Sequence, residues 1–199
     1  MKRRAALLIA LLVAAIAAGL FLAGILDPAE KREQAQVPIG GPFKLVDQTG
    51  RTVTEADYAG RFMLVYFGYT YCPDICPTGL ATISAAYDLL TPEEQAQLVP
   101  IFITVDPERD TPEVMAGYVS LFHPALQGLS GSPQAIASAI AAYRVYARKV
   151  EDKDRASTDY LVDHSTFAYL MDRENHYLTH FPHGMLAEDM AAKIRDYLD

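Results

Sequence analysis

Both cysteines of the chain lie in one short segment, YCPDICP, in which three residues separate Cys72 from Cys76. Three kinds of chemistry fit such a pair. An inert disulfide is one, although a bridge that closes so small a loop constrains little of the unfolded chain. A redox dithiol is the second, although the usual C-x-x-C motif has a shorter spacing. A metal clamp is the third, because side chains four apart on a helical turn face the same way and can hold one ion between their sulfurs.

The cysteine segment follows a predicted strand and opens a predicted helix. Phe62–Phe67 (FMLVYF) is a continuous apolar run rich in strand-forming residues, and Pro77–Leu90 has a helical pattern. Loops at the carboxyl ends of strands are where α/β folds place their chemistry. We therefore expect Cys76 at or near the start of the helix, where free backbone amides and the helix dipole favour a thiolate.

Two sulfurs do not complete a metal site, and the histidines of the chain are candidates for a further ligand. His164 is the strongest of them, because it lies in YLVDHSTF, between a polar, charged stretch and a predicted strand. Asp163 precedes it and is predicted to orient the imidazole or to shape the local electric field. The HFPH segment has ligand-like spacing, but Pro182 and the end of a predicted strand favour a surface position. The five histidines are His123, His164, His176, His180 and His183.

The order of predicted elements is that of an α/β sandwich with a mixed central sheet. It matches a thioredoxin-like fold with an added amino-terminal β-hairpin. The predicted strands are Phe43–Val46, Arg51–Val53, Phe62–Phe67, Ile101–Val105, Val145–Val150, Phe167–Met171 and Tyr177–Phe181. The predicted helices are Pro77–Leu90, Pro92–Leu98, Thr111–Phe122, Ser132–Tyr143 and Ala187–Leu198.

Composition restricts the function further. The chain has 199 residues, of which 51% are hydrophobic, and a formal net charge of −8. Its first 26 residues contain three bases and no acid, so the remainder carries 14 bases against 25 acids, a balance of −11. A surface this acidic repels phosphate backbones, which argues against nucleic-acid binding.

The amino terminus predicts a membrane anchor. After MKRR, Ala5–Ile25 is a run of 21 residues without a charge or strongly polar group. At about 1.5 Å per residue this run reaches across a hydrocarbon core of about 30 Å. Positive charge on the short amino-terminal side keeps Met1 in the cytoplasm. We therefore expect residues 1–26 to be a single-pass anchor in the cytoplasmic (inner) membrane, 27–39 a tether, and 40–199 one domain on the periplasmic side.

Four separate stretches carry a resemblance: GGPFKLVDQTG, YFGYTYCPDICP, ITVDPERDTPEVM and YLVDHSTFAYLMD. Over about residues 40–199 they resemble the Sco/SenC copper chaperones of cytochrome c oxidase assembly. The resemblance implies a thioredoxin-like fold that binds one copper ion, with Cys72 and Cys76 as thiolate ligands and His164 as the histidine ligand. It also places Asp106 in an acidic motif that is associated with metal handling in that family.

The chemistry of this donor set agrees with copper. Two thiolates and one imidazole suit Cu(I) and, with an added ligand or a distorted geometry, Cu(II). Zinc is the second choice, because it prefers four ligands and the sequence offers three. Beside Asp106, we expect Arg109 and Asp110 to form an ion pair that stabilises their loop.

The resemblance implies a metallochaperone rather than an enzyme. Its partner would be the copper-site subunit of cytochrome c oxidase, with other periplasmic copper or thiol proteins as further partners. The alternative is a thiol–disulfide oxidoreductase that reduces the cysteines of that copper site through a Cys72–Cys76 disulfide. His164 favours the metal, because a pure reductase needs an attacking and a resolving cysteine but no imidazole ligand.

Overall fold

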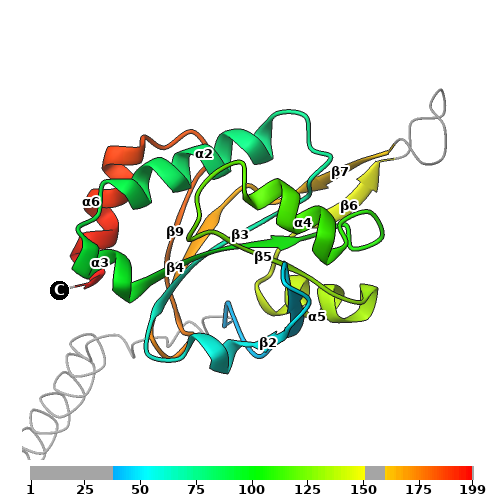
Figure 1. Cartoon of the computed structure of the whole chain (residues 1–199), viewed down its shortest axis with the longest axis horizontal. Coiled ribbons are helices and arrows are strands. Elements are labelled where there is room, and N and C mark those ends of the chain that lie inside the picture. The colour runs from blue at the N-terminus through cyan, green and yellow to red at the C-terminus, as the bar shows by residue number, and fades with distance from the viewer. Residues whose placement is uncertain (1–37, 151–159, 199) are drawn as a thin grey trace, which may run out of the picture. The chain divides into compact units, whose positions relative to one another are not determined.

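Seven strands form the central sheet of the computed structural model, which describes residues 38–150 and 160–198. Their order across the sheet is β2-β1-β5-β4-β3-β8-β9 (Figure 1). β3, β4 and β5 are parallel, whereas the other pairings are antiparallel, so the predicted mixed sheet is confirmed. The strands are β1 (Lys44–Asp47), β2 (Thr52–Thr54), β3 (Phe62–Gly68), β4 (Leu98–Thr104), β5 (Gln127–Ser130), β8 (Ala168–Met171) and β9 (Tyr177–Phe181).

Helices cover both faces of the sheet (Figure 1). α2 (Ile75–Asp88) packs against α6 (Ala187–Leu198) on one face, and α5 (Pro133–Ala142) lies on the other. α4 (Pro112–Val119) packs against β5, and its Tyr118 ring contacts Phe102 of β4. The remaining helices are the short α3 (Pro92–Gln97), before β4, and the 3-10 helix η1 (Glu55–Tyr58), after β2.

The strand before the cysteines is buried along its whole length. Every residue of β3 and of its neighbour β4 is buried, as the apolar run FMLVYF predicts. Successive side chains of β3 point to opposite faces. Tyr66 faces α2, where Gly79 leaves it room, since a Cβ at Gly79 would lie 2.9 Å from the Tyr66 hydroxyl oxygen. Phe67 faces the other layer, with its ring centre 5.3 Å from that of Tyr143. β3 is therefore a rigid support for the loop that follows it.

Local sequence signals place the starts of α4 and α5 and the hairpin correctly, whereas α2 begins at Ile75, two residues before the predicted start at Pro77. The side chains of Thr111 and Ser132 each accept a hydrogen bond from the amide three residues later, and a proline occupies the next position. The predicted hairpin is β1–β2, which extends the sheet because β1 also pairs with β5. Asp47 stabilises its turn by accepting hydrogen bonds from the amides of Thr49 and Arg51.

The structure differs from the prediction at β4 and α4. β4 begins at Leu98 rather than at Ile101. Its Pro100 lies opposite Leu64 of β3 and outside the part of β4, residues 101–103, that pairs with β5. α4 ends at Val119 rather than at Phe122. At the observed end, the Ser120 hydroxyl donates to the carbonyl of residue 117 at 2.7 Å and competes with helical hydrogen bonding.

Two short strands are not predicted by the sequence patterns. β5 (QGLS) contains Gly128, a poor strand former, which is needed because a Cβ there would lie 2.9 Å from Val119 of α4. The other is β7 (Leu161–His164), which pairs with β6 (Ala147–Val150) in a separate two-stranded ladder. The strand predicted at 145–150 is thus confirmed over residues 147–150, and its partner is the segment that carries His164.

The predicted anchor lies outside the described residues. Within the ranges 38–150 and 160–198, no helix is long and apolar enough to cross a bilayer. The span at Ala5–Ile25 and the tether at residues 27–39 therefore stay predictions.

Candidate metal centre

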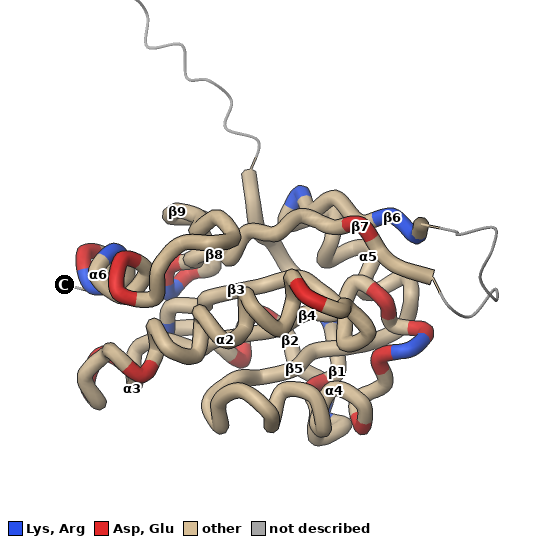
Figure 2. Tube along the Cα trace, turned by 90° about the horizontal axis from the view of Figure 1, so that it is seen from above, with Lys and Arg blue, Asp and Glu red and all other residues tan. Residues whose placement is uncertain are grey.

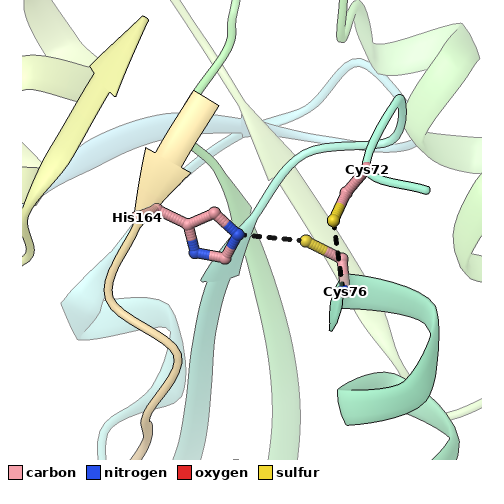
Figure 3. A group of neighbouring side chains, drawn as sticks. All are labelled: Cys72, Cys76 and His164. Atoms are coloured by element: carbon pink, nitrogen blue, oxygen red, sulfur yellow. Dashed lines mark hydrogen bonds between the residues drawn. The ribbon is translucent and has the colours of Figure 1, made fainter. Parts of the chain in front are cut away.

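Three segments of the chain bring Cys72, Cys76 and His164 together (Figure 3). Cys72 lies in the loop after β3, Cys76 is the second residue of α2, and His164 is the last residue of β7. Their ligand atoms all lie within 4.8 Å of one another, and the Cys76 sulfur is 3.2 Å from His164 Nε2. Typical bonds to a metal are about 2.3 Å from sulfur and about 2.0 Å from imidazole nitrogen. The three donors can therefore contact one ion with little movement.

The Cys76 side chain is completely buried at the end of β3. Gly68 makes room for it, because a Cβ at Gly68 would lie 2.7 Å from the Cys76 sulfur and 2.8 Å from a ring carbon of Phe102. The hydrogen bond to Cys72 and burial raise the pKa of Cys76. In the metal-free protein Cys76 therefore retains its proton.

We expect Gly68→Ala to destabilise the fold by about 1–3 kcal/mol, because its methyl group overfills this space. The matched control is Gly117→Ala in α4, where an added Cβ meets no atom within 4 Å outside its own helix. Helix propensity predicts that this control stabilises the protein by up to about 1 kcal/mol. Chemical denaturation measures both free energies of unfolding. Equal stability of the two variants would contradict the close packing of β3 against Cys76.

Cys72 is the more accessible thiol and the one whose pKa is lowered. The backbone amide of Cys76 donates to the Cys72 sulfur at 3.3 Å (Figure 3). The hydrogen bond from the Cys76 side chain is the largest cause that lowers the pKa of Cys72 to about 3; burial opposes it, and the amides of Asp74 and Cys76 assist. The helix start was predicted to favour a thiolate at Cys76. It stabilises Cys72 instead, because the first amides of α2 point back toward the sulfur that precedes the helix.

The His164 ring presents Nε2 to the two sulfurs. Its Nδ1 lies 2.9 Å from the carbonyl oxygen of Ser165. A carbonyl can only accept, so Nδ1 carries the proton and the lone pair of Nε2 faces the cysteines. The rings of Tyr66 and Tyr69 contact the imidazole edge-on, with centres 6.5 and 5.8 Å away. This is the tautomer that a metal ligand needs.

Asp163 does not hold the imidazole. It is exposed in β7, and the partner of His164 Nδ1 is the Ser165 carbonyl. In the β6–β7 register Asp163 lies opposite Arg148, a pairing of opposite charges (Figure 2). The predicted orienting role therefore belongs to Ser165, and an effect of Asp163 on the local field stays a prediction.

Asp106 is buried and pairs with Arg109. Its carboxylate accepts a hydrogen bond from Arg109 Nε and another, at 2.7 Å, from the Tyr160 hydroxyl. Arg109 therefore pairs with Asp106, not with Asp110 as the sequence predicted. Asp106 joins the loop after β4 to the segment that leads into β7, and its predicted part in metal handling stays a prediction.

Asp110 supports the cysteine loop, a role that the sequence patterns do not reveal. It is fully buried and accepts hydrogen bonds from the amide and hydroxyl of Thr70, at 3.0 and 2.6 Å, and from the Thr104 hydroxyl at 2.6 Å. Burial raises the pKa of Asp110, and these hydrogen bonds oppose the rise. Because Thr70 lies two residues before Cys72, Asp110 fixes the loop against the end of β4. The sequence feature that could have indicated this role is the position of Asp110 between a predicted strand and a predicted helix.

The other histidines do not join the three donors. His123 Nε2 lies 3.2 Å from a carboxylate oxygen of Asp88. His180 and His183 are exposed, as the HFPH segment predicts. A second group of potential donor atoms lies around the β8–β9 turn and consists of Asp172, Glu174 and His176.

Comparison with known sequences gives one family. A sequence profile described as SCO1/SenC matches residues 31–199. "Protein SCO1 homolog 1, mitochondrial" of Arabidopsis thaliana is 44% identical over 163 residues, which cover 80% of this chain and 48% of that protein. "Protein SenC" of Rhodobacter capsulatus is 42% identical over 165 residues, which cover 83% of this chain and 73% of that protein. The chain thus spans about half the length of the Arabidopsis relative.

Comparison with solved structures gives the same fold. The structure of Bradyrhizobium japonicum ScoI with copper bound superposes with a TM-score of 0.73 at 46% sequence identity, over 80% of this chain and 99% of that chain. The copper-bound ScoI of Arabidopsis thaliana superposes with a TM-score of 0.72 at 41% identity, over 80% of this chain and 98% of that chain. The predicted thioredoxin-like α/β fold is confirmed by this likeness.

Proposed function

The chain belongs to the SCO1/SenC family, and from this premise we propose that its cargo is one copper ion bound by Cys72, Cys76 and His164. The observation that carries the proposal is the group itself, two thiols and an imidazole with all ligand atoms within 4.8 Å. One thiol already has a lowered pKa, and the imidazole turns its free lone pair toward both sulfurs. The copper-bound structure of Bradyrhizobium japonicum ScoI supports the assignment.

The donor set favours copper over zinc. Two sulfurs and one nitrogen form a soft, three-coordinate set that suits Cu(I), and an added ligand completes a site for Cu(II). Zinc prefers four protein ligands at closed sites, and the group formed by the described residues has three.

We further propose that the protein is a metallochaperone, which delivers its copper to the copper site of cytochrome c oxidase. Three protein donors leave the ion open to a further ligand, and the half-buried Cys72 lies on the accessible side. A thiolate of the acceptor protein could therefore bind the ion before the outgoing ligands release it. Such a protein has no turnover chemistry of its own.

The cysteine pair also supports a second function, thiol–disulfide exchange. Both thiols are free, Cys72 is accessible with a lowered pKa, and Cys76 lies beside it in the position of a resolving thiol. Such a dithiol could reduce the cysteines of the oxidase copper site before copper is loaded. His164 has no part in that reaction, and its substitution therefore separates the two functions.

Anaerobic copper titration of the full chain in detergent tests the proposed cargo. We expect one copper per chain when the cysteines are reduced. We expect His164→Ala to weaken Cu(II) binding far more than Cu(I) binding, because two thiolates still hold the softer ion. Absorption spectra follow the thiolate–copper bands of both proteins. His183→Ala, at an exposed histidine, is the matched control and should change neither ion. Equal Cu(II) binding by wild type and His164→Ala would contradict the three-donor site.

We propose that a single span at Ala5–Ile25 anchors the protein in the cytoplasmic membrane with residues 40–199 on the periplasmic side. The charge asymmetry around that run supports this orientation. A phosphatase that is active only after export should be active when fused to the carboxyl terminus. Activity there of a reporter that works only in the cytoplasm would contradict the topology.

A further inference from the structure

The proposed copper site joins two sheets that share no strand pairing. The cysteines follow β3 of the seven-stranded sheet, whereas His164 ends the separate β6–β7 ladder. We call this β6–β7 ladder the ribbon. A two-stranded ladder is marginally stable by itself, so the position of the ribbon depends on side-chain contacts with the rest of the domain. A groove of about 210 Å³, lined by Ile136 and Ile140 of α5 and by Ala147 and Val162 of the ribbon, shows that packing against α5 leaves space there. Other contacts must fix the imidazole opposite the sulfurs.

The guanidinium of Arg109 contacts both sides of this junction. On the ribbon side, its Nη1 donates to the carbonyl of Tyr160 at 3.0 Å, and its central carbon lies 3.8 Å from the centre of the Tyr160 ring. On the other side, the same carbon lies 4.8 Å from the ring centre of Tyr71, the residue before Cys72. Tyr160 leads directly into β7, which ends at His164. One side chain thus bridges the segments that carry the two kinds of ligand.

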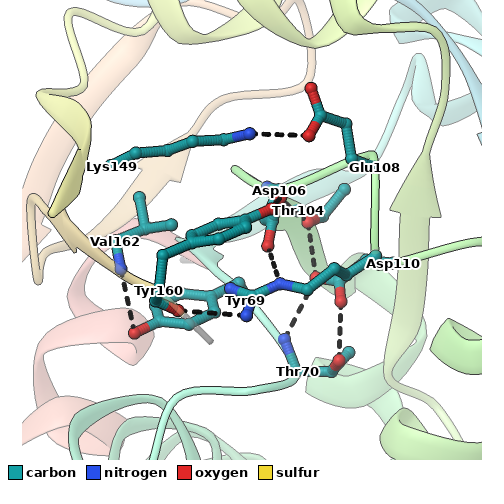
Figure 4. Close-up of polar contacts among 10 residues, drawn as sticks. Tyr69, Thr70, Thr104, Asp106, Glu108, Asp110, Lys149, Tyr160 and Val162 are labelled. Carbon is teal, nitrogen blue, oxygen red and sulfur yellow. Dashed lines mark hydrogen bonds and ion pairs between the residues drawn. The ribbon is translucent and has the colours of Figure 1, made fainter. Parts of the chain in front are cut away.

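A buried carboxylate holds the guanidinium in place (Figure 4). Asp106 accepts from Arg109 Nε with one oxygen and from the Tyr160 hydroxyl with the other. The amide of Asp106 donates to the Thr104 hydroxyl at 2.8 Å, which ties the arrangement to the end of β4. The Asp106 side chain is 0% exposed and that of Arg109 is 21% exposed, so solvent screens this pair little.

Other contacts also join the ribbon to the main domain. The Val162 amide donates to the Tyr69 hydroxyl at 3.2 Å, and Arg109 lies 5.7 Å from the centre of the Tyr69 ring, so it packs against the residue that makes this bond (Figure 4). The ion pair of Lys149 with Glu108 is 46% and 60% exposed, and such pairs contribute little. Arg109 thus contacts the segment that leads into β7, the tyrosine before Cys72 and the ring to which the Val162 amide is bonded.

We propose that Arg109 is a positioning residue, which sets the distance and orientation of His164 relative to Cys72 and Cys76. It acts through Tyr160 and the tyrosines beside the cysteine loop, not by contact with the metal. The inference rests on the proposed copper site. A planar guanidinium suits the position, because it donates in two directions while its face stacks on aromatic rings, which an ammonium group cannot do.

The test compares Arg109→Ala and Arg109→Lys with Arg173→Ala in the full chain. Arg173 is the matched control, because it also stacks on a ring, 4.6 Å from the centre of Phe62, and donates to Gln97, but at the opposite end of β3. Loss of a residue that orients a metal ligand typically lowers metal affinity about 10- to 100-fold. We expect that loss for Cu(II) in Arg109→Ala, with altered absorption and electron paramagnetic resonance spectra, and a loss near the lower end of that range in Arg109→Lys. Cu(I) binding should change much less, and Arg173→Ala should alter neither ion.

Hydrogen exchange in the metal-free protein gives a readout independent of copper. We expect Arg109→Ala to speed exchange of the Val162 amide but not of amides in β3. If the wild type bound no copper, the proposed function would fail, and the exchange rates would still decide the inference. If the wild type bound Cu(II) through His164 while Arg109→Ala kept its spectra, affinity and Val162 exchange, the inference would be overturned. Should Arg109→Ala fail to fold, Arg109→Lys decides by the same measurements.

Discussion

Oxidation of Cys72 and Cys76 to a disulfide is expected to abolish tight copper binding, because the bridge consumes both thiolate donors. The single variants Cys72→Ser and Cys76→Ser should each weaken Cu(I) binding more than about 100-fold, which exceeds the effect typical of a residue that only orients a ligand. A hydroxyl is a hard donor that suits Cu(I) poorly. Competition with a chelator of known affinity, for reduced and oxidised protein in parallel, measures these losses.

Two controls make this result specific. Re-reduction of the oxidised protein should restore binding, which excludes irreversible oxidation of the sulfurs. His176→Ala should leave binding unchanged, because this exposed histidine belongs to the separate group with Asp172 and Glu174. Undiminished binding by the oxidised protein would contradict the role of the two sulfurs. A loss in His176→Ala would instead place copper in that second group.

The sequence was sufficient for the parts of the site that depend on local pattern. FMLVYF predicts a strand covered on both faces, and β3 is buried at every residue. In the sequence, a predicted strand is followed by Cys72 and then by the start of a predicted helix. This order predicts that both sulfurs lie at the carboxyl end of the strand, where the structure has them. Both inferences work because strand burial and helix initiation are set by residues close together in sequence.

Contacts between distant segments could not be predicted in the same way. His164 lies 88 residues after Cys76, and periodicity gives no information about which loops meet. The four residues of β7 are too few for a clear strand pattern, and β7 is fixed by β6 and by side chains from other loops. The acids of DPERDTP illustrate the same limit. Arg109 could pair with Asp106 or Asp110, and only the turn after β4 makes Asp106 the partner.

The position of His164 decides between delivery of copper and reduction of thiols. A reductase needs the cysteines to cycle between thiol and disulfide. The largest cause of the lowered pKa of Cys72 is the hydrogen bond from the Cys76 side chain, and His164→Ala leaves that cause in place. A chaperone, in contrast, loses one of its three donors. We therefore expect His164→Ala to impair assembly of the oxidase copper site as severely as the double variant Cys72→Ser/Cys76→Ser.

Cells that lack the chromosomal gene and express each variant provide the measurement, with oxidase activity and membrane-bound copper as readouts. His164→Ala should still form the Cys72–Cys76 disulfide, as thiol labelling can establish, and His183→Ala should support normal assembly. Added copper should partly restore assembly in cells without the protein, because the proposed function makes the defect one of delivery. Normal assembly with His164→Ala, together with rescue of the deletion by a chemical reductant but not by copper, would reject the chaperone. The dithiol would then act as an oxidoreductase, and the imidazole would be dispensable for the function of the protein.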